Sequence, residues 1–206
     1  MSILLYHMTH VQNLPSIIRT GCLYCDKQAQ AHQARSIAYT NLKAKRAAKL
    51  VPVPPNGVIA DYVPFYFAPR SPMLYAVHTG YVGTGLVQSE IVYLVTTVDT
   101  IVQAGKSFVF TDRHPLSSSP RFCNNLNQLN HHVDWQVMQS LYWNDTPECP
   151  DRKSRRQAEF LVYQMVEWTL IEQIGVFNRE RLAQVSKVLA SAAHQPPVQV
   201  RRDWYY

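Results

Sequence analysis

The fold of this 206-residue chain is decided by one stretch, Arg155-Arg156-Gln157-Ala158-Glu159-Phe160-Leu161-Val162-Tyr163. A basic, polar segment runs directly into residues that favour a short β-strand beginning at Glu159. Side chains alternate between the two faces of a strand, so Glu159 shares a face with the apolar Leu161 and Tyr163. A carboxylate there is costly unless it has a partner or a task. It is either the strand-end partner of a neighbouring arginine or a catalytic group at the mouth of a cleft.

The N-terminal segment places further polar side chains at the end of a strand. Ile3-Leu4-Leu5-Tyr6-His7 is apolar and predicts a strand, which Met8-Thr9-His10 follows. A histidine and a threonine therefore lie where the first strand ends. A short helix is expected next, from Asn13 to Arg19, because its aliphatic residues have helical spacing and Pro15 is tolerated in the first turn. A second extended piece covers Cys22 to Cys25.

One arginine is singled out by helical periodicity. A helix is expected from about Thr40 to Leu50, after a polar loop at residues 26–35. At about 3.6 residues per turn, Leu42, Arg46 and Leu50 stack on one face. Arg46 is then a cation between two apolar anchors, which indicates that it faces inward. The alternative is an arginine whose charged end reaches solvent from the edge of the core.

The middle of the chain supplies most of the predicted strands. Tyr62 to Phe67 is dense in aromatic residues, and Ile91 to Thr97 and Ser107 to Thr111 are also strand-like. A helix begins at about Pro72, so Arg70 lies at a strand-to-helix turn. Such turns favour phosphate, because the positive end of the helix dipole is near.

A long irregular segment runs from Asp112 to about Ser154, with a helix expected near 134–140. Long segments of this kind in a compact domain are usually functional. It combines cations with aromatic residues, namely Arg113, His114, Arg121, Trp135, Tyr142, Trp143, Arg152 and Lys153. Such a mixture suits single-stranded nucleic acid, whose bases stack on rings while its phosphates meet charges. The alternative is an ordinary packed insertion whose aromatic residues extend the core.

The C-terminal part predicts a helix from Arg179 to Ala193 and a last strand from Val198 to Arg202. The final residues, Asp203-Trp204-Tyr205-Tyr206, are too aromatic for a free tail, and we expect them to be docked. Short strands and short helices alternate irregularly, without a Gly-rich phosphate fingerprint. The chain therefore predicts a single mixed α+β domain over residues 1–206 rather than a doubly wound sheet.

Composition limits the classes of partner. The net charge of +6, from 20 basic and 14 acidic residues, favours an anionic partner, either nucleic acid or a phosphate-bearing small molecule. Cys22 and Cys25 form an isolated CxxC, with Cys123 and Cys149 far along the chain. No metal site is expected, and free thiols in a reducing cytoplasm are. No stretch approaches ~20 apolar residues and no signal sequence is recognisable, so we expect neither membrane insertion nor secretion.

Three of these features together resemble the ADP-ribosyltransferase superfamily: the His and Thr at residues 6–10, the inward-facing Arg46 and the late-strand Glu159. In that superfamily a first-strand His or Arg and a late-strand Glu flank NAD in a split β-sheet. More specifically, five blocks resemble the DarT toxins, which ADP-ribosylate a base in single-stranded DNA. They are YHMTHVQNLPSIIRTG (6–21), GVIADYVPFYFAPRSPMLY (57–75), FVFTDRHP (108–115), RRQAEFLVY (155–163) and RRDWYY (201–206). The blocks follow one another in order over nearly the whole chain.

The resemblance implies roles for particular residues. Glu159 would be the catalytic glutamate, and Arg46 the catalytic arginine within an NAD-covering element at about residues 30–48. The substrate-recognition loop would run from about residue 114 to 159. The residues that would bind NAD are His7, Met8, Thr9, Ser16, Tyr24 and Arg46. The candidate DNA contacts are Arg70, Met73, Arg113, His114, Arg121, Arg155 and Arg156.

The same resemblance implies a biological setting. NAD would be the co-substrate, without a metal, and the chain would be the toxin of a toxin–antitoxin pair. A DarG-like macrodomain antitoxin would remove the modification. We expect a monomer that acts on thymine, with guanine as the alternative base.

The chemistry requires these residue types. Departure of nicotinamide from a ribose carbon leaves cationic character that a carboxylate stabilises, most strongly where water is excluded. The accepting base nitrogen loses a proton, which a carboxylate can take. A permanently charged arginine can grip a pyrophosphate or polarise the base. Two alternatives stay open, an NAD-dependent transferase for protein or RNA and a non-catalytic single-stranded-DNA-binding module.

Overall fold

A computed structural model describes residues 2–32, 35–37, 40–81 and 85–206. Its strands are β1 (Leu4–His10), β2 (Cys22–Tyr24), β3 (Tyr62–Tyr66), β4 (Ile91–Thr97), β5 (Phe108–Thr111), β6 (Phe122–Cys123), β7 (Glu159–Tyr163), β8 (Met165–Glu167), β9 (Gln173–Val176) and β10 (Val198–Val200). Its α-helices are α1 (Leu14–Thr20), α2 (Asp26–Ala29), α3 (Thr40–Ala48), α4 (Pro72–His78), α5 (Val98–Gln103), α6 (Leu129–His132), α7 (Trp135–Gln139), α8 (Arg152–Arg155) and α9 (Arg179–Leu189).

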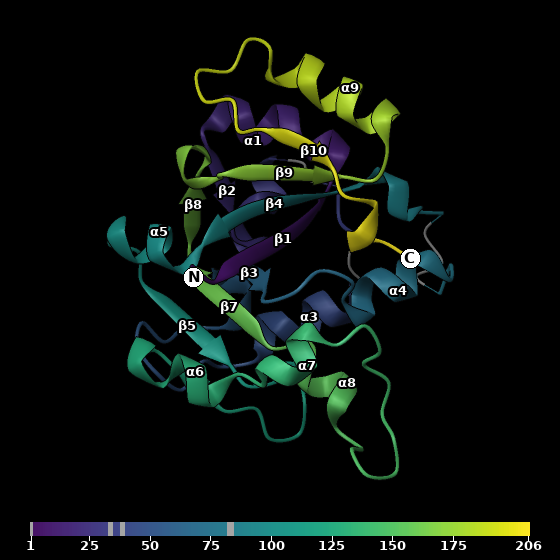
Figure 1. Ribbon diagram of the computed structural model, residues 1–206. Helices are drawn as coiled ribbons and strands as arrows, with labels where there is room; N and C mark the ends of the chain where they lie inside the picture. Colours follow the sequence, from purple (N-terminus) through teal and green to yellow (C-terminus); the bar gives the residue numbers. More distant parts are fainter. Residues whose placement is uncertain (1, 33–34, 38–39, 82–84) are drawn as a thin grey trace.

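A central sheet organises these elements, in the order β10-β9-β4-β1-β3-β7-β5-β6 (Figure 1). Neighbouring strands are antiparallel except β9 and β10, which are parallel. Strands β2 and β8 form a separate antiparallel pair. Sheets built mainly from antiparallel strands, with helices packed around them, are the α+β organisation that the sequence predicts.

The sheet is split between β1 and β3. β1 pairs with β4 along its whole length, from Leu4↔Thr97 to His10↔Ile91. Its pairing with β3 is registered only at Tyr6↔Tyr66. The predicted split β-sheet is therefore confirmed, and its two halves are β10-β9-β4-β1 and β3-β7-β5-β6.

Pro64 explains where the split occurs. The N–H and C=O of a strand residue point to the same neighbouring strand. The Pro64 carbonyl accepts a hydrogen bond from Nδ1 of His7 on β1, at 2.8 Å, so the side that lacks an N–H also faces β1. Pro64 therefore offers β1 no ladder donor, and its acceptor is taken by a side chain. The ladder cannot continue past this point.

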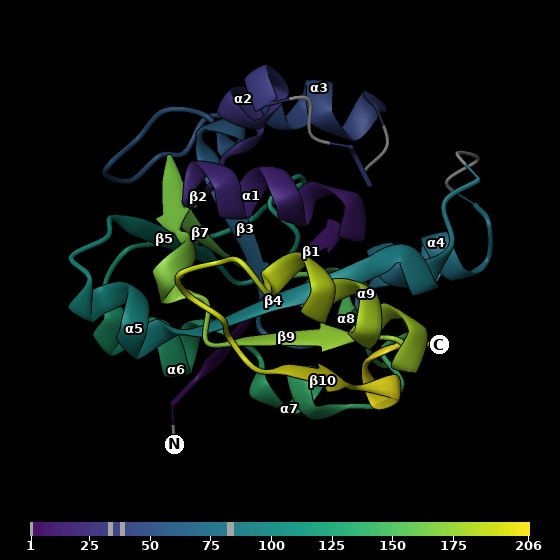
Figure 2. The ribbon, with the colours of Figure 1, turned by 90° about the horizontal axis from the view of Figure 1, so that it is seen from above.

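The two faces of the sheet carry separate cores. Leu5, Phe65 and Phe160 belong to a core that also contains residues of α1 and α9. The opposite face divides into two smaller clusters. One contains Tyr6 and Tyr93 together with residues of α4 and the C-terminus, and the other contains Tyr62, Val109 and Leu161. Figure 2 shows α2 and α3 standing together at one side of the molecule, near α1.

Some predicted elements differ from the observed ones. Residues 26–35 were expected as a polar loop, but α2 and a 3-10 turn at Gln30–His32 begin this segment. The basic residues before β7 form α8 rather than a loop. Leu50 does not anchor α3, because the helix ends at Ala48 and Leu50 is 70% exposed. The long segment from 112 to 154 contains α6 and α7, close to the helix expected there.

The C-terminus is docked, as its aromatic residues predict. Trp204 lies flat against the backbone of Gly175 in β9, and its ring meets Tyr93 edge-on at 5.5 Å. The Tyr205 hydroxyl donates to the carbonyls of Ile91 and Gly175. The last residues thus close the face of the sheet that α4 also covers.

The contact between Gly175 and Trp204 gives a test of this docking. A Cβ at position 175 would lie 2.2 Å from a ring carbon of Trp204. Gly175→Ala is therefore expected to lower the free energy of unfolding by about 1–3 kcal/mol, measured by urea denaturation. In a Trp204→Ala background, Gly175→Ala should change the free energy of unfolding only slightly. An equal cost in both backgrounds would contradict the packing described here.

Candidate active site

The buried carboxylate of Glu159 pairs with Arg46. Nη1 of Arg46 donates to Oε1 of Glu159 and Nη2 donates to Oε2, both at 2.9 Å. The side chains are 11% and 1% exposed. Two parallel hydrogen bonds between a guanidinium and a carboxylate are a strong, directional arrangement. The prediction that Arg46 faces inward is confirmed.

The neighbouring arginines do not pair with Glu159. Its partner lies 113 positions away in the sequence, on α3. The interpretation of Glu159 as the solvated partner of Arg155 or Arg156 is therefore wrong. The backbone N–H of Glu159 donates to the hydroxyl of Thr111 at 3.0 Å, which fixes the start of β7 against β5. Glu159 is thus held at a defined place, with its carboxylate turned toward α3.

His7 is held as a neutral imidazole with a defined tautomer. Burial lowers its pKa below the ordinary 6.5, although the Pro64 carbonyl and Asp26 favour the charged form. A carbonyl can only accept, so Nδ1 carries the proton that it donates to Pro64. Nε2 is then an acceptor. His7 can receive a hydrogen bond from a ligand amide or hydroxyl.

Thr9 belongs to a network that the sequence did not reveal. Nδ2 of the buried Asn13 donates to the Thr9 hydroxyl at 3.0 Å and to the Arg35 carbonyl at 2.9 Å, while its Oδ1 accepts from the Arg35 N–H at 2.8 Å. Asn13 stands where the sequence predicts the start of a helix. The structure shows no capping bond from its side chain. Asn13 instead joins the end of β1 to the segment that precedes α3.

These side chains line one cavity of about 310 Å³, a size typical of small-molecule sites. Nine of the predicted site residues lie in its wall: His7, Met8, Thr9, Ser16, Tyr24, Arg46, Met73, His114 and Glu159. Sequence reasoning missed others, among them Asn13, His32, Tyr66 and Gln157. Lys153, also in the wall, belongs to the cations that it associated with nucleic acid. Ile17, Leu23 and Leu42 make part of the wall apolar.

The split in the sheet brings these groups together. Leu5 packs in the core with α1, so alternation turns His7 and Thr9 toward that face. Leu161 packs in a cluster on the opposite face, and Glu159 points the same way. In a continuous sheet, groups on opposite faces are separated by the backbone. Here the gap between β1 and β3 lets them line a common cavity.

Two tyrosines of the cavity wall, Tyr24 and Tyr66, have well-defined surroundings. Tyr24 stacks on His32 with ring centroids 4.6 Å apart and planes at 12°. Tyr66 lies opposite Glu159 across β3 and β7. Burial, and then the charge of Glu159, raise the pKa of Tyr66 above the ordinary 10, so its hydroxyl stays protonated and can donate.

His114 lies in the same cavity. Burial lowers its pKa below 6.5; the charge of Glu159 opposes this shift and that of Arg46 adds to it. Its Nδ1 accepts from the backbone N–H of Leu116 at 3.2 Å. In the neutral ring the proton is then on Nε2. His114 is a hydrogen-bond donor, whereas His7 offers an acceptor.

Most of the predicted DNA-binding arginines lie outside the cavity wall and are already paired. The 3%-exposed Asp112 accepts from Nε of Arg113 at 3.1 Å and from Nε of Arg121 at 3.0 Å. Arg155 pairs with Asp134 and Asp151. Arg113–Asp112 and Arg155–Asp151 are local pairs, whereas Arg121–Asp112 and Arg155–Asp134 join residues 9 and 21 positions apart. Much of the positive charge of this segment is neutralised internally.

Arg156 is buried and structural. It is 5% exposed, and its Nη1 donates to the carbonyls of Val137 and Met138 at 2.7 and 2.6 Å. Nη2 donates to the carbonyl of Pro69 at 2.6 Å. A guanidinium enclosed in this way cannot reach a DNA phosphate. The expected DNA contact of Arg156 is therefore corrected, since its donors are used to hold α7 and the turn before α4.

Arg70 differs from these arginines. In the part of the chain that the structure describes, no carboxylate pairs with it. Its guanidinium lies over the ring of Tyr206, 4.7 Å from the centroid. Met73 follows on α4 and lines the cavity. Arg70 is thus the predicted DNA contact whose charge is left available beside the site.

Comparison with known proteins decides the family. Residues 6–206 match the family described as "DarT: ssDNA thymidine ADP-ribosyltransferase, DarT". The chain belongs to this family. A DNA ADP-ribosyl transferase of Thermus sp. (strain 2.9) is 45% identical over 204 residues, which cover 98% of this chain and 95% of the relative. The predicted reaction, ADP-ribosyl transfer to single-stranded DNA, is thereby confirmed, and the family description agrees with thymine as the expected base.

Solved structures of DarT from Thermus sp. 2.9 have the same fold. The complex with ADP-ribosylated ssDNA has a TM-score of 0.92 at 42% identity and covers 100% of this chain and 97% of the other. The complex with NAD⁺ has a TM-score of 0.89. A fusion protein of Thermosipho africanus, a DNA ADP-ribosyl transferase joined to a DNA ADP-ribosyl glycohydrolase, is 25% identical over 90% of this chain and 45% of its own length.

Neither a metal site nor a membrane-spanning helix is found among the described residues. They contain no group of three or more His, Cys, Asp or Glu side chains arranged to hold a metal ion. They also contain no helix with the length and apolar character needed to cross a membrane.

The two neutral histidines of the cavity predict a pH dependence of stability, to which the buried His10 adds in the same direction, because burial lowers its pKa as well. Both pKa values lie below 6.5 in the folded state, so the unfolded chain takes up protons first as the pH falls. The stability that each neutral histidine contributes is complete above about pH 6.5, the pKa of histidine in the unfolded chain, and is lost as the pH falls below it. Between about pH 7.5 and about pH 5.5 the free energy of unfolding should decrease, and it should decrease less in His7→Gln. The opposite trend, or an unchanged slope in both His7→Gln and His114→Gln, would contradict this assignment.

Proposed function

We propose that this chain uses NAD to ADP-ribosylate thymidine in single-stranded DNA at the cavity between β1 and β7. The observation that carries the proposal is the buried Arg46–Glu159 pair facing His7 and Thr9 across that cavity. Glu159 is proposed as the catalytic carboxylate and Arg46 as the catalytic arginine. The NAD⁺ complex of the Thermus relative supports this choice of co-substrate.

The donor set of the cavity fits NAD. His7, Met8, Thr9, Ser16 and Tyr24 form the proposed nicotinamide and ribose side, where Nε2 of His7 accepts and the Tyr24–His32 stack provides a flat apolar surface. Residues of about 30–48 are proposed as the NAD-covering element, of which 33, 34, 38 and 39 lie outside the described residues. An ion pair between Lys43 of α3 and Asp26 of α2, at 3.5 Å, ties this element to the helix that precedes it.

The residues account for the transfer as follows. NAD supplies the ADP-ribosyl group, and its bond to nicotinamide is broken. Glu159 stabilises positive charge that develops at the ribose, because it is a buried carboxylate from which water is largely excluded. A thymine ring nitrogen that forms the new bond gives up its proton, which Glu159 can receive. For this, Arg46 has to release at least one carboxylate oxygen, and its freed donors can bind a phosphate or the base.

Residues from two sides of the cavity form the proposed DNA site. His114, Lys153 and Gln157 come from the segment of about 114–159, which we propose as the substrate-recognition loop. Arg70 and Met73 come from the turn before α4 and from α4 itself. Arg113, Arg121 and Arg155 are proposed as contacts only through donors that their aspartates leave free. Single-stranded DNA fits best, because its bases incur no unpairing cost.

The proposed setting is a toxin–antitoxin pair. The Thermosipho relative that joins a transferase to a DNA ADP-ribosyl glycohydrolase supports a DarG-like macrodomain partner. We propose that the chain acts as a monomer in the cytoplasm. The four cysteines are free, which is usual in a reducing compartment.

Replacing Glu159 tests the catalytic assignment. Glu159→Gln keeps the shape but removes the negative charge, so transfer from labelled NAD to a thymidine-containing oligonucleotide should fall by about 100-fold or more. Glu180→Gln, at an exposed glutamate of α9 outside the cavity wall, is the matched control and should retain wild-type rates. Circular dichroism checks that both variants fold. Full activity of a folded Glu159→Gln would remove Glu159 from the mechanism.

The acceptor and the partner are tested together. Purified protein is offered single-stranded DNA, duplex DNA, RNA and protein with labelled NAD, and label should enter single-stranded DNA containing thymidine. A DNA ADP-ribosyl glycohydrolase should remove it, and co-expression of that enzyme should rescue cells whose growth the chain arrests. Label in RNA or protein alone would favour a different transferase. NAD binding without any transfer would favour a catalytically inactive member.

A further inference from the structure

The turn that carries Arg70 has an unusual backbone conformation, and side chains from other parts of the chain form hydrogen bonds to it. Arg70 has φ of 55°, a left-handed conformation that non-glycine residues rarely adopt. Its N–H lies 3.3 Å from the Tyr93 hydroxyl, and its carbonyl accepts from the Tyr206 hydroxyl at 2.8 Å. The carbonyl before it, on Pro69, accepts from Arg156. Such conformations persist where surrounding groups over-determine them.

The Tyr206 side chain forms hydrogen bonds both to the Arg70 turn and to Trp143. Its hydroxyl donates to the Arg70 carbonyl and also accepts from Nε1 of Trp143 at 2.9 Å. Its backbone is fixed by Gln88, which accepts from the Tyr206 N–H at 2.9 Å and donates to its carbonyl at 2.6 Å. One hydroxyl therefore joins the proposed recognition loop, through Trp143, to the turn of Arg70.

The ring of Tyr206 also orients the Arg70 side chain. The Arg70 guanidinium lies over the ring of Tyr206. The rings of Tyr75 and His78, both on α4, also contact the Tyr206 ring, with centroid distances of 5.1 and 5.8 Å. A planar cation on an aromatic surface keeps its charge and loses conformational freedom. Nε of Arg70 is buried without a partner among the described residues, so an external anion would meet the Nη groups of the guanidinium. The side chain is prepared for an external anion.

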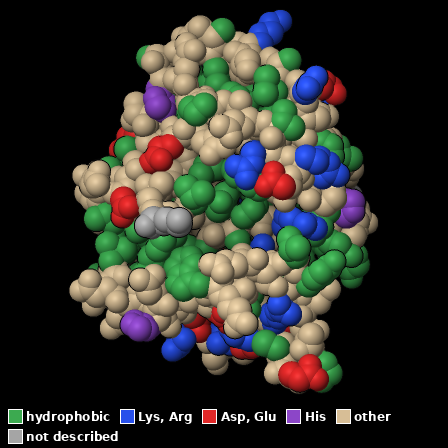
Figure 3. Space-filling model, in the orientation of Figure 1, with side chains coloured by type: hydrophobic (Ala, Val, Ile, Leu, Met, Phe, Trp, Pro, Cys, Tyr) green, Lys and Arg blue, Asp and Glu red, His purple; other side chains and the backbone are tan. Residues whose placement is uncertain are grey.

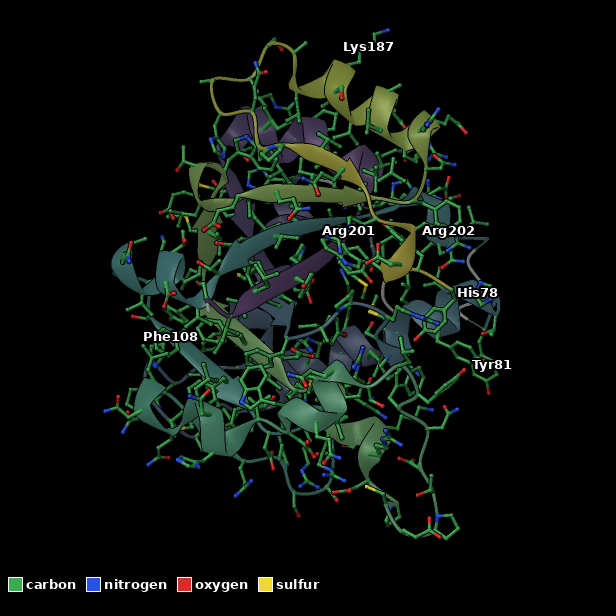
Figure 4. The ribbon with its side chains drawn as sticks, in the orientation of Figure 1. His78, Tyr81, Phe108, Lys187, Arg201 and Arg202 are labelled. Atoms are coloured by element: carbon green, nitrogen blue, oxygen red, sulfur yellow. The ribbon has the colours of Figure 1, made fainter. Side chains whose placement is uncertain are left out.

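The surroundings are suited to a DNA strand. Lys, Arg and His side chains gather beside apolar ones over α4 and the C-terminal end (Figure 3). Figure 4 places His78 of α4 near Arg202, whose Nη2 donates to the Tyr206 carbonyl at 2.8 Å. Pro72, Met73 and Ala76 of α4 line the cavity on the other side of the same helix. Helix α4 therefore lies between this surface and the proposed active site.

We propose that Tyr206 is a positioning residue for DNA recognition. Its hydroxyl holds Trp143 and the Arg70 turn in a fixed relation, and its ring presents the Arg70 guanidinium to a DNA phosphate next to the modified base. The proposal rests on the proposed contact between Arg70 and DNA. It assigns the C-terminal residue to substrate binding, at a distance from the Glu159 carboxylate and from the NAD side of the cavity.

Tyr206→Phe removes the hydroxyl and keeps the ring. The KM for a thymidine-containing oligonucleotide at saturating NAD should rise by about two- to tenfold, the effect of one lost hydrogen bond. The KM for NAD at saturating oligonucleotide should stay at the wild-type value. Tyr205→Phe is the matched control, because its hydroxyl donates to the carbonyls of Ile91 and Gly175 in the sheet. Tyr205→Phe should lower the melting temperature and leave the KM for DNA unchanged.

Arg70→Ala and the double variant separate the inference from the function on which it rests. Arg70→Ala should raise the KM for DNA, and adding Tyr206→Phe to it should change little further. An unchanged KM for DNA in Arg70→Ala would overturn the Arg70 contact. A raised KM in Arg70→Ala with a wild-type KM in Tyr206→Phe would overturn the role of Tyr206 alone. Equal rises in KM for DNA in Tyr205→Phe and Tyr206→Phe, or a full Tyr206→Phe effect without Arg70, would show a purely structural role.

Discussion

The interruption of the ladder between β1 and β3 at Pro64 is the constraint on which the active site depends. Pro64 has no N–H for β1, and its carbonyl is taken by the ring of His7. The same contact therefore ends the pairing of the two half-sheets and fixes the tautomer of a proposed NAD-binding residue. Because the sheet is open there, His7 and Thr9 on one face share a cavity with Glu159 on the other. Fold and site arise from one local feature.

Within that opening, the Arg46–Glu159 pair connects the sheet to the proposed NAD-covering element. A buried ion pair is stable only when both charges keep hydrogen-bonding partners. In the proposed mechanism, a ligand that enters the cavity replaces some of the bonds that Arg46 and Glu159 make to each other. The pair thus keeps the carboxylate oriented before the ligand arrives.

Sequence patterns located the functional groups better than they located their partners. Alternation in residues 159–163 and the helical period around Arg46 correctly indicated which way these side chains point. Neither pattern could show that the two meet, since 113 positions separate them; the family resemblance supplied that link. Leu50 was misplaced because α3 stops at Ala48, before the next turn can form. Helical periodicity does not fix where a helix ends.

The assignment of Arg156 shows a second limit. Arg156 looked like a DNA contact because it lies beside Glu159 in a basic stretch, yet it is buried against the carbonyls of Val137, Met138 and Pro69. Asp112 and Asn13 attracted no attention, although one neutralises two arginines and the other ties β1 to residue 35. Such roles depend on tertiary contacts between distant segments. Charge counted along the sequence overestimates the charge that is available to DNA.

A crystal structure of this chain with a non-hydrolysable NAD analogue tests the account most directly. The account predicts that the nicotinamide riboside lies between His7 and Glu159, with Nε2 of His7 accepting from the ligand. Arg46 should have released at least one oxygen of Glu159. A ligand bound elsewhere, or a bound ligand with both Arg46–Glu159 hydrogen bonds intact, would contradict it.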